Sequence, residues 1–165
     1  MAAALVAVGA LAWIGPSGAV ADSRHGSSAK PVTVDQPLRV LGAKADLLVG
    51  TAVDMNALNT DTPYRERVRT EFSAVTAENV MKWSELEPTR GQYNWGPADQ
   101  LVAEARRNGQ QIHGHTLLWH NQLPAWLTDG VASGDIDSAE LRDIVRNHIR
   151  TVVGHFKGKV RAWDV

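Results

Sequence analysis

The stretch DLLVGTAVD at residues 46–54 is a nearly continuous apolar run with β-branched residues, enclosed by two aspartates, and it decides the class of fold. A strand that is covered on both faces of a sheet has such a run, whereas a strand with one solvated face alternates apolar and polar residues. Strands of the first kind are typical of parallel sheets with helices on each side. The stretch therefore predicts a buried strand of an α/β structure.

The residues that follow this run alternate between helix and strand signals. Thr62 suits the cap of a helix and Pro63 its first position, and the helix is expected to run through Tyr64, Val68 and Phe72. Residues 73–77 form a predicted second strand of ordinary length. A further helix has Pro97 near its start and Gly109 just past its end, with an apolar stripe made by Leu101, Val102 and Ala105.

The same alternation continues to residue 165. The stretch QIHGHTLLW at residues 111–119 is a predicted third strand, and KVRAWDV at residues 159–165 is a predicted fourth. Between them, Asp137 and Glu140 have the spacing of a capping box, and Gly158 is expected to end the helix that they begin. The residues that recur at helical spacing within it are Leu141, Ile144, Val145, His148, Ile149, Val152 and Val153.

Four strands separated by three helices predict parallel α/β architecture with right-handed crossovers. An open doubly wound sheet would usually carry a glycine-rich phosphate turn after the first strand, but GTAVDMNALNTD at residues 50–61 has no such pattern. A closed barrel has eight strands in about 250 residues. Both closures of this α/β fold stay open at this point. A partial (β/α)8 TIM barrel, with about its first four strands and three helices, would require further strands to close.

Composition limits the partners that the protein can bind. The chain has 165 residues, 44% of them hydrophobic and 21% charged, as expected of one globular domain. Its 17 basic and 18 acidic residues leave a net charge of -1, so no field favours a nucleic acid. Six of the ten aromatic residues are tryptophan. Tryptophan faces suit sugar rings, although filling of a core is their more frequent use.

The first 21 residues are apolar and end in Ala19-Val20-Ala21 before Asp22, which resembles a secretory signal and its cleavage site. The positively charged start of such a signal is missing. A membrane anchor is the alternative, and the glycines and proline near residues 15–18 weaken it. We expect export to the extracellular space without stable membrane association. Residues 22–37 have the composition of a linker, and the domain is expected to occupy residues 38–165.

Three motifs carry a resemblance to a known family. They are ENVMKW at residues 78–83, GHTLLWH at residues 114–120 and WDV at residues 163–165. In combination, at these separations, they resemble family 10 of the glycoside hydrolases, the endo-1,4-β-xylanases, over about residues 38–165. The resemblance implies a (β/α)8 barrel that cleaves xylan with retention of configuration and without a cofactor.

The resemblance also places the catalytic groups. In that family an acid/base glutamate follows the WDV stretch, and the nucleophilic glutamate lies on strand seven. Both would lie beyond Val165, so the chain resembles the N-terminal half of a xylanase with no catalytic residue of its own. The isolated chain is therefore expected to be inactive and to bind the non-reducing side of the cleaved bond.

The motif after the second strand supplies three candidate substrate-binding residues. By resemblance, Asn79 holds a hydroxyl of the sugar beside the cleaved bond and Lys82 donates to sugar hydroxyls. The alternatives are a turn-forming asparagine and a solvated surface lysine. Glu78 is expected to orient Asn79 or Lys82, or to form a plain salt bridge. Trp83 and Trp163 are expected to pack near the barrel mouth.

Three histidines in IHGHTLLWH, residues 112–120, raise the question of a metal site. His113 and His115 face the same way on a strand, as ligands of zinc in a metal-dependent barrel hydrolase would. The first strand has no histidine and HGHTLLWHNQ has no carboxylate, so no metal is expected. His115 is then expected to donate to a sugar hydroxyl as a neutral imidazole, with Trp119 against the ring and Gln122 as a further contact. His113 and His120 are expected to be core or supporting groups, and His148 and His155 structural.

Two alternatives to a catalytic role follow from the predicted half-barrel. One is a binding protein that holds xylan without cutting it, and the other is an incomplete, unstable fragment. Half a barrel leaves two strand edges unpaired and one sheet face uncovered, so self-association through these edges is expected. All of these interpretations require that the ends of the second and third strands form one shared surface.

Overall fold

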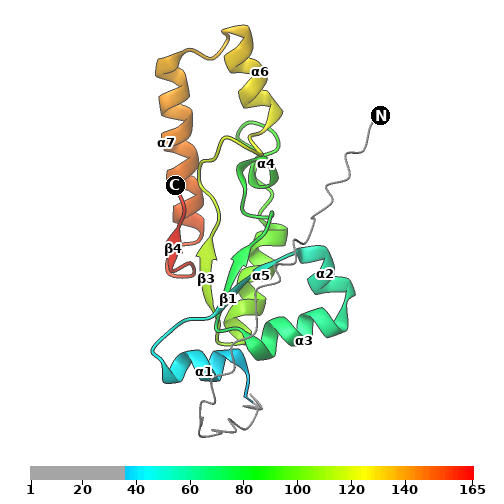
Figure 1. Ribbon diagram of the computed structural model, residues 1–165. Helices are drawn as coiled ribbons and strands as arrows, with labels where there is room; N and C mark the ends of the chain where they lie inside the picture. Colours follow the sequence, from blue (N-terminus) through cyan, green and yellow to red (C-terminus); the bar gives the residue numbers. More distant parts are fainter. Residues whose placement is uncertain (1–35) are drawn as a thin grey trace, which may run out of the picture. The chain divides into compact units, whose positions relative to one another are not determined.

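The computed structural model describes residues 36–165, so the signal-like segment at residues 1–21 and nearly all of the linker at residues 22–37 lie outside the described residues. The described part contains one parallel four-stranded sheet (Figure 1). Its strands are β1 (Gly50–Val53), β2 (Ala74–Ala77), β3 (Gln111–Gly114) and β4 (Ala162–Trp163). Each strand pairs with the next one along the chain, in the order β1-β2-β3-β4.

This strand order distinguishes the two closures that the sequence left open. A doubly wound sheet reverses its direction of winding at a switch point, whereas a barrel adds every strand on the same side. The sheet has no reversal over its four strands. The predicted partial (β/α)8 barrel is confirmed.

The three predicted crossover helices are present. They are α3 (Thr62–Glu71), α5 (Gly96–Arg107) and α7 (Ser138–His155). Four shorter helices were not predicted: α1 (Leu38–Lys44), α2 (Met55–Thr60), α4 (Trp83–Leu86) and α6 (Ala125–Ser133). Among residues 36–165, no helix combines the length and the apolar character that crossing a bilayer requires.

The helix ends differ from the prediction by a few residues. Asp61, not Thr62, caps α3, because its carboxylate accepts a hydrogen bond from the Tyr64 amide at 3.0 Å while its own backbone is extended. Thr62 and Pro63 are therefore the first and second helical positions. Helix α7 ends at His155, and Gly158 lies in the turn beyond it with a φ of 73°.

Asp137 caps α7 as predicted, but the capping box is only half formed. The Asp137 carboxylate accepts hydrogen bonds from the amides of Ala139 at 2.9 Å and Glu140 at 2.8 Å. The Glu140 side chain pairs instead with Arg90 at 2.7 Å. Helix α7 is thereby tied to the loop that follows α4.

The first strand has one covered face, so the expectation of two covered faces was wrong. Val53 is buried, whereas Gly50 and Ala52 are exposed, and Leu47 just before the strand is 62% exposed. The reason is that the helices cover one face of the sheet only. The register aligns buried Val75 with buried Ile112 on that face and places Thr76 beside His113 on the other. The second face is open among the described residues.

Two clusters of buried side chains hold these elements together. The larger cluster packs Val53, Val75 and Ile112 of the sheet against Leu101 of α5 and Val152 of α7. Each such side chain contributes about 1.5–3 kcal/mol when it is fully buried. The smaller cluster joins α4, α6 and the segment before α7 through Trp83, Leu127 and Ile136. It therefore packs the segments that follow β2 and β3 against each other.

Candidate functional site

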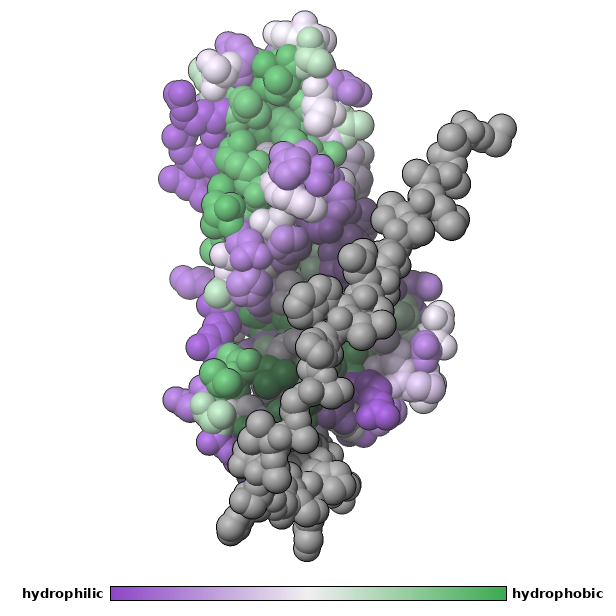
Figure 2. Space-filling model, viewed as in Figure 1, coloured by the Kyte–Doolittle hydropathy of each residue, from purple (hydrophilic) through white to green (hydrophobic). Residues whose placement is uncertain are grey.

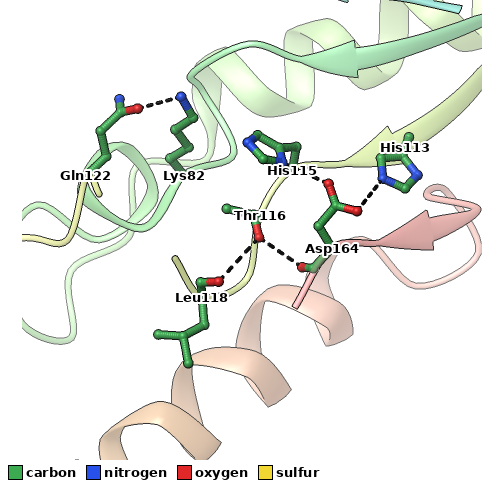
Figure 3. Close-up of polar contacts among 7 residues, drawn as sticks. All are labelled: Lys82, His113, His115, Thr116, Leu118, Gln122 and Asp164. Carbon is green, nitrogen blue, oxygen red and sulfur yellow. Dashed lines mark hydrogen bonds and ion pairs between the residues drawn. The ribbon is translucent and has the colours of Figure 1, made fainter. Parts of the chain in front are cut away.

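The segments after β2 and β3 bring three polar side chains into contact. The Lys82 ammonium donates hydrogen bonds to the side-chain oxygens of Asn79, at 3.1 Å, and Gln122. The Gln122 amide also donates to the Asn79 oxygen at 3.3 Å. These three residues, together with His115 and Trp119, are called the strand-end cluster below. Figure 3 shows Lys82 and Gln122 on one side of it and His115 on the other.

Lys82 is the least expected member of this cluster, because it is only 9% exposed. Lysine is rarely buried without a reason, so the alternative of a solvated surface charge does not apply. No carboxylate pairs with it among residues 36–165. Two of its three N–H groups are used by Asn79 and Gln122, which leaves one donor without a partner among the described residues.

Aromatic side chains border this donor. The Lys82 ammonium lies 5.1 Å from the centre of the Trp119 ring, a cation–π distance. The His115 imidazole lies 5.8 Å from the same indole, tilted by 56°. Trp119 is half-buried, so part of its face remains available. A flat apolar face beside a fixed donor is the combination that holds a sugar ring.

Sequence reasoning missed Asp164. Its carboxylate lies between two imidazoles, accepting from His115 Nδ1 at 2.8 Å and from His113 Nε2 at 2.9 Å (Figure 3). The stretch HGHTLLWHNQ itself has no carboxylate, but the residue after β4 supplies one to His115 from 49 positions away in the chain. The signal that could have identified it is the WDV stretch, since the carboxyl ends of neighbouring parallel strands share one edge.

Asp164 is held in place by its backbone. Its amide donates to the Gly114 carbonyl at 3.0 Å, and its carbonyl accepts from the Leu117 amide at 3.0 Å. Close approach of β4 requires the glycine at position 114, because a Cβ atom there would lie 2.2 Å from the Trp163 ring. The segment on both sides of His115 is thus bonded to Asp164.

The imidazoles of His113 and His115 both form hydrogen bonds to Asp164. Each carboxylate oxygen faces a different ring nitrogen at hydrogen-bonding distance. Within residues 36–165, no group of three or more histidine, aspartate or glutamate side chains is arranged to hold a metal ion.

Comparison with known proteins identifies the family. The sequence profile named Glycosyl hydrolase family 10 matches residues 38–165. The chain belongs to this family. Endo-1,4-beta-xylanase 3 of Hypocrea jecorina is 45% identical over 138 residues, which are 81% of this chain and 36% of that protein. Endo-1,4-beta-xylanase B of Thermotoga neapolitana is 44% identical over 133 residues, 79% of this chain and 37% of that protein.

Solved structures of family 10 agree with the fold. Xylanase 10B from Thermotoga petrophila in complex with xylobiose is 41% identical, with a TM-score of 0.72 over 78% of this chain and 39% of that chain. Xylanase XynB from Paenibacillus barcinonensis is 34% identical, with a TM-score of 0.71 over 81% of this chain and 39% of that chain. The chain thus spans a little over a third of the length of the curated relatives. The resemblance seen in the three motifs is confirmed at the level of the family.

The structure also places the other residues that the sequence analysis of this family 10 chain named. Glu78 is exposed, and its carboxylate hydrogen-bonds to neither Asn79 nor Lys82 within the described part of the chain, so Gln122 orients those two residues instead. Trp163 is half-buried against Phe156, with ring centres 5.8 Å apart. His120 is exposed and lies edge-on to Trp119. His155 is bonded to Asp99 of α5 at 2.8 Å.

A buried carboxylate fixes the segment that carries Lys82. Glu87 is 4% exposed and accepts hydrogen bonds from the Trp83 indole at 2.9 Å, His148 Nδ1 at 3.1 Å and the Gly91 amide at 2.8 Å. The Trp83 and His148 rings stack at 4.0 Å. Burial lowers the pKa of His148, which favours the neutral imidazole. Because Trp83 directly follows Lys82, this network sets the position of the lysine backbone.

Asp164 gives a prediction for the pH dependence of stability. Hydrogen bonds from His115 and then His113 hold the pKa of its carboxyl below the ordinary value. Between the folded pKa and the unfolded value of about 3.9, the unfolded chain binds more protons. The stabilisation is therefore present above about pH 4 and is lost as the pH falls through the folded pKa.

We expect the urea midpoint of the unaltered chain to exceed that of the Asp164→Asn chain at pH 5. The difference should shrink as the pH falls from about 4 through the folded pKa of Asp164, because below that pKa the carboxyl is uncharged, as the amide of the variant is. Urea titrations at each pH, followed by tryptophan fluorescence, measure it. A difference that widens in acid would contradict the assignment.

Proposed function

We propose that this chain provides the sugar-binding part of an endo-1,4-β-xylanase that hydrolyses the backbone of xylan. The observation that carries the proposal is the buried Lys82 ammonium. Among the described residues one of its N–H groups has no partner, and the ammonium lies beside the Trp119 ring at the carboxyl ends of β2 and β3. Functional groups of (β/α)8 enzymes lie at that end of the strands. The relatives named above are xylanases, and one solved relative holds xylobiose.

The chemistry of the strand-end cluster suits a neutral sugar. Sugar hydroxyls need donors and acceptors in a fixed array, and the C–H face of the ring needs a flat apolar surface. Lys82, Asn79 and Gln122 hold each other through hydrogen bonds, so their polar atoms are positioned before a ligand arrives. In the proposed retaining reaction one carboxylic acid protonates the leaving oxygen, and a second carboxylate about 5 Å away attacks the anomeric carbon. The strand-end cluster contributes to that reaction by holding the sugar in position.

Binding of a defined oligosaccharide tests the proposal. Xylohexaose is titrated into the full ¹⁵N-labelled chain, with chitohexaose as the control sugar. We expect chemical-shift changes at the Trp119 indole and the Gln122 amide, and none at the Trp95 indole, which stacks on His155 away from the cluster. Equal responses to both sugars, or changes at Trp95 alone, would refute a xylan site at this edge.

The 165-residue chain by itself is expected to release no reducing sugar from xylan. Retaining hydrolysis needs two carboxyl groups at the scissile bond. Among the described residues, the carboxylate bonded to a member of the strand-end cluster is that of Asp164, and both of its oxygens accept from histidines. A reducing-sugar assay on the pure chain measures this, and product formation in proportion to the chain would contradict it.

A non-catalytic xylan-binding protein is the second candidate function. The same geometry favours it. The polar side chains of the strand-end cluster hold each other in place, and the carboxylate that contacts the cluster, Asp164, is already bonded to His115. Affinity electrophoresis in xylan separates the candidates from an unfolded fragment, which would not be retarded. Retardation without reducing-sugar release supports the binding role for the isolated chain.

The chain is expected to self-associate. Within residues 36–165, β1 pairs only with β2 and β4 only with β3, so two strand edges are unpaired. Large apolar side chains are exposed near these edges, with Leu47 at 62% and Val165 at 82%. Figure 2 shows further apolar side chains gathered between α6 and α7. Leu118, after β3, and Val131 of α6 are also exposed. Sedimentation velocity at several concentrations should show association that Leu47→Lys reduces; a monomer at every concentration would contradict it.

Export is also proposed. The apolar composition of residues 1–21 and the small residues before Asp22 support it, although they lie outside the described residues. The test is N-terminal sequencing of protein recovered from the culture medium, which should begin at Asp22.

A further inference from the structure

The hydrogen bond between Asp164 and His115 determines which ring nitrogen of His115 carries a proton. A carboxylate only accepts hydrogen bonds, so the 2.8 Å contact with His115 Nδ1 requires a hydrogen on that nitrogen. In a neutral imidazole the other nitrogen is then an acceptor. His115 Nε2 has no hydrogen-bond partner among residues 36–165. This arrangement differs from the sequence-based expectation that a neutral His115 donates to the sugar.

Asp164 cannot easily turn away from this contact. Its amide and carbonyl are bonded to Gly114 and Leu117, on opposite sides of His115. The Thr116 hydroxyl donates to the same carbonyl at 3.1 Å (Figure 3). The second carboxylate oxygen is occupied by His113 Nε2 at 2.9 Å. The carboxylate is thus fixed at both oxygens, and its orientation dictates the orientation of the His115 ring.

We propose that Asp164 is a positioning residue that keeps His115 in its Nδ1–H form and so presents His115 Nε2 as the hydrogen-bond acceptor for a sugar hydroxyl. The proposal rests on the proposed function, because it assumes that the strand-end cluster holds a sugar. A hydroxyl group both donates and accepts. Lys82 offers a donor and His115 an acceptor, both close to Trp119, so the cluster can satisfy both capacities of the ligand.

Nitrogen NMR of the histidine rings tests the proton position without any ligand. The full chain, labelled with ¹⁵N in histidine, is recorded at pH 8, where an ordinary imidazole is neutral. We expect His115 to show the Nδ1–H pattern in the unaltered chain and to lose it in Asp164→Asn, whose side chain can donate as well as accept. An Nε2–H pattern for His115 in the unaltered chain would overturn the proposal.

Sugar affinity tests the second half of the proposal. Asp164→Asn is expected to weaken xylohexaose binding about tenfold, as loss of one oriented hydrogen bond would. The matched control is His113→Gln, which leaves the Asp164–His115 contact in place and should keep both the ring pattern and an affinity within about twofold. The Trp83 indole signal reports that each variant is folded.

The outcomes separate this inference from the proposed function. Altered ring protonation with unchanged affinity in Asp164→Asn would overturn the acceptor role while leaving xylan binding intact. No binding of xylohexaose by the unaltered chain would overturn the proposed function and the acceptor role together. A tenfold loss in Asp164→Asn, with His113→Gln unaffected in both measurements, supports the proposal.

Discussion

Replacing Glu87 by leucine is expected to lower the free energy of unfolding by about 3–5 kcal/mol. The carboxylate is 4% exposed and accepts from Trp83, His148 and Gly91, so its loss leaves two buried side-chain donors and one partly buried backbone amide without this partner. Each such donor costs about 1–3 kcal/mol. Urea unfolding of the full chain at pH 7.5 and one fixed concentration, followed by tryptophan fluorescence, measures the change.

Two further variants make this prediction specific. Glu87→Gln keeps one side-chain oxygen as an acceptor, so it should cost about 1–2 kcal/mol, less than the leucine variant. Glu66→Gln removes an exposed partner of Arg69 on α3 and should change stability by less than about 0.5 kcal/mol. If Glu87→Leu were as stable as Glu66→Gln, the buried network would not anchor the α4 segment.

The same network connects stability with the site. Glu87 binds the indole of Trp83, and the amide of the next residue, Ser84, donates to the Gln122 carbonyl at 3.0 Å. Lys82 lies immediately before these two anchored residues, and its side chain contacts Gln122 as well. The buried carboxylate therefore holds the segment after β2 against the segment after β3.

Local signals in the sequence predicted the main elements of the fold. β-branched runs, proline near helix starts and the Asp137 cap predicted the order of four strands and the three crossover helices. The strands are shorter than predicted: β1 begins at Gly50 and not at residue 46, and β3 ends at Gly114 and not at residue 119. The helices that were missed have weaker signals. Helix α6 contains Gly130 and lacks a capping side chain. Helix α2 has a good cap, because Asp54 accepts from the Ala57 amide at 2.7 Å, but Asp54 also ends an apolar run and was assigned to the strand.

Contacts across the sheet could not be predicted in the same way. Asp164 meets His113 and His115 because the register pairs His113 with Ala162, and register depends on packing rather than on any local pattern. The burial of Lys82 could not be predicted from the sequence either, because lysine is usually exposed. The resemblance to family 10 supplied the residues of the strand-end cluster, and the structure brings Asn79, Lys82, His115, Trp119 and Gln122 together at one edge.

Replacing Lys82 by methionine is expected to weaken xylohexaose binding by about 100-fold or more. The ammonium supplies the free donor and also holds the Asn79 and Gln122 oxygens in place, so its removal affects three ligand contacts at once. Methionine keeps an unbranched side chain beside Trp119 and lacks the charge. Isothermal titration calorimetry with the full chain measures the change.

The stability of this variant distinguishes a binding role from a structural one. A lysine kept only for structure would lower stability when it is replaced by methionine, because the Asn79 and Gln122 oxygens lose their donor, and the affinity would not change. Burying an ammonium without a carboxylate partner is costly, however, so its removal need not destabilise the chain. A lysine kept for binding should lose affinity while stability stays level or rises. Lys159→Met, beyond α7 and away from the cluster, is the matched control and should bind xylohexaose as the unaltered chain does. If Lys82→Met bound within threefold of that control, the buried donor would have no part in holding the sugar.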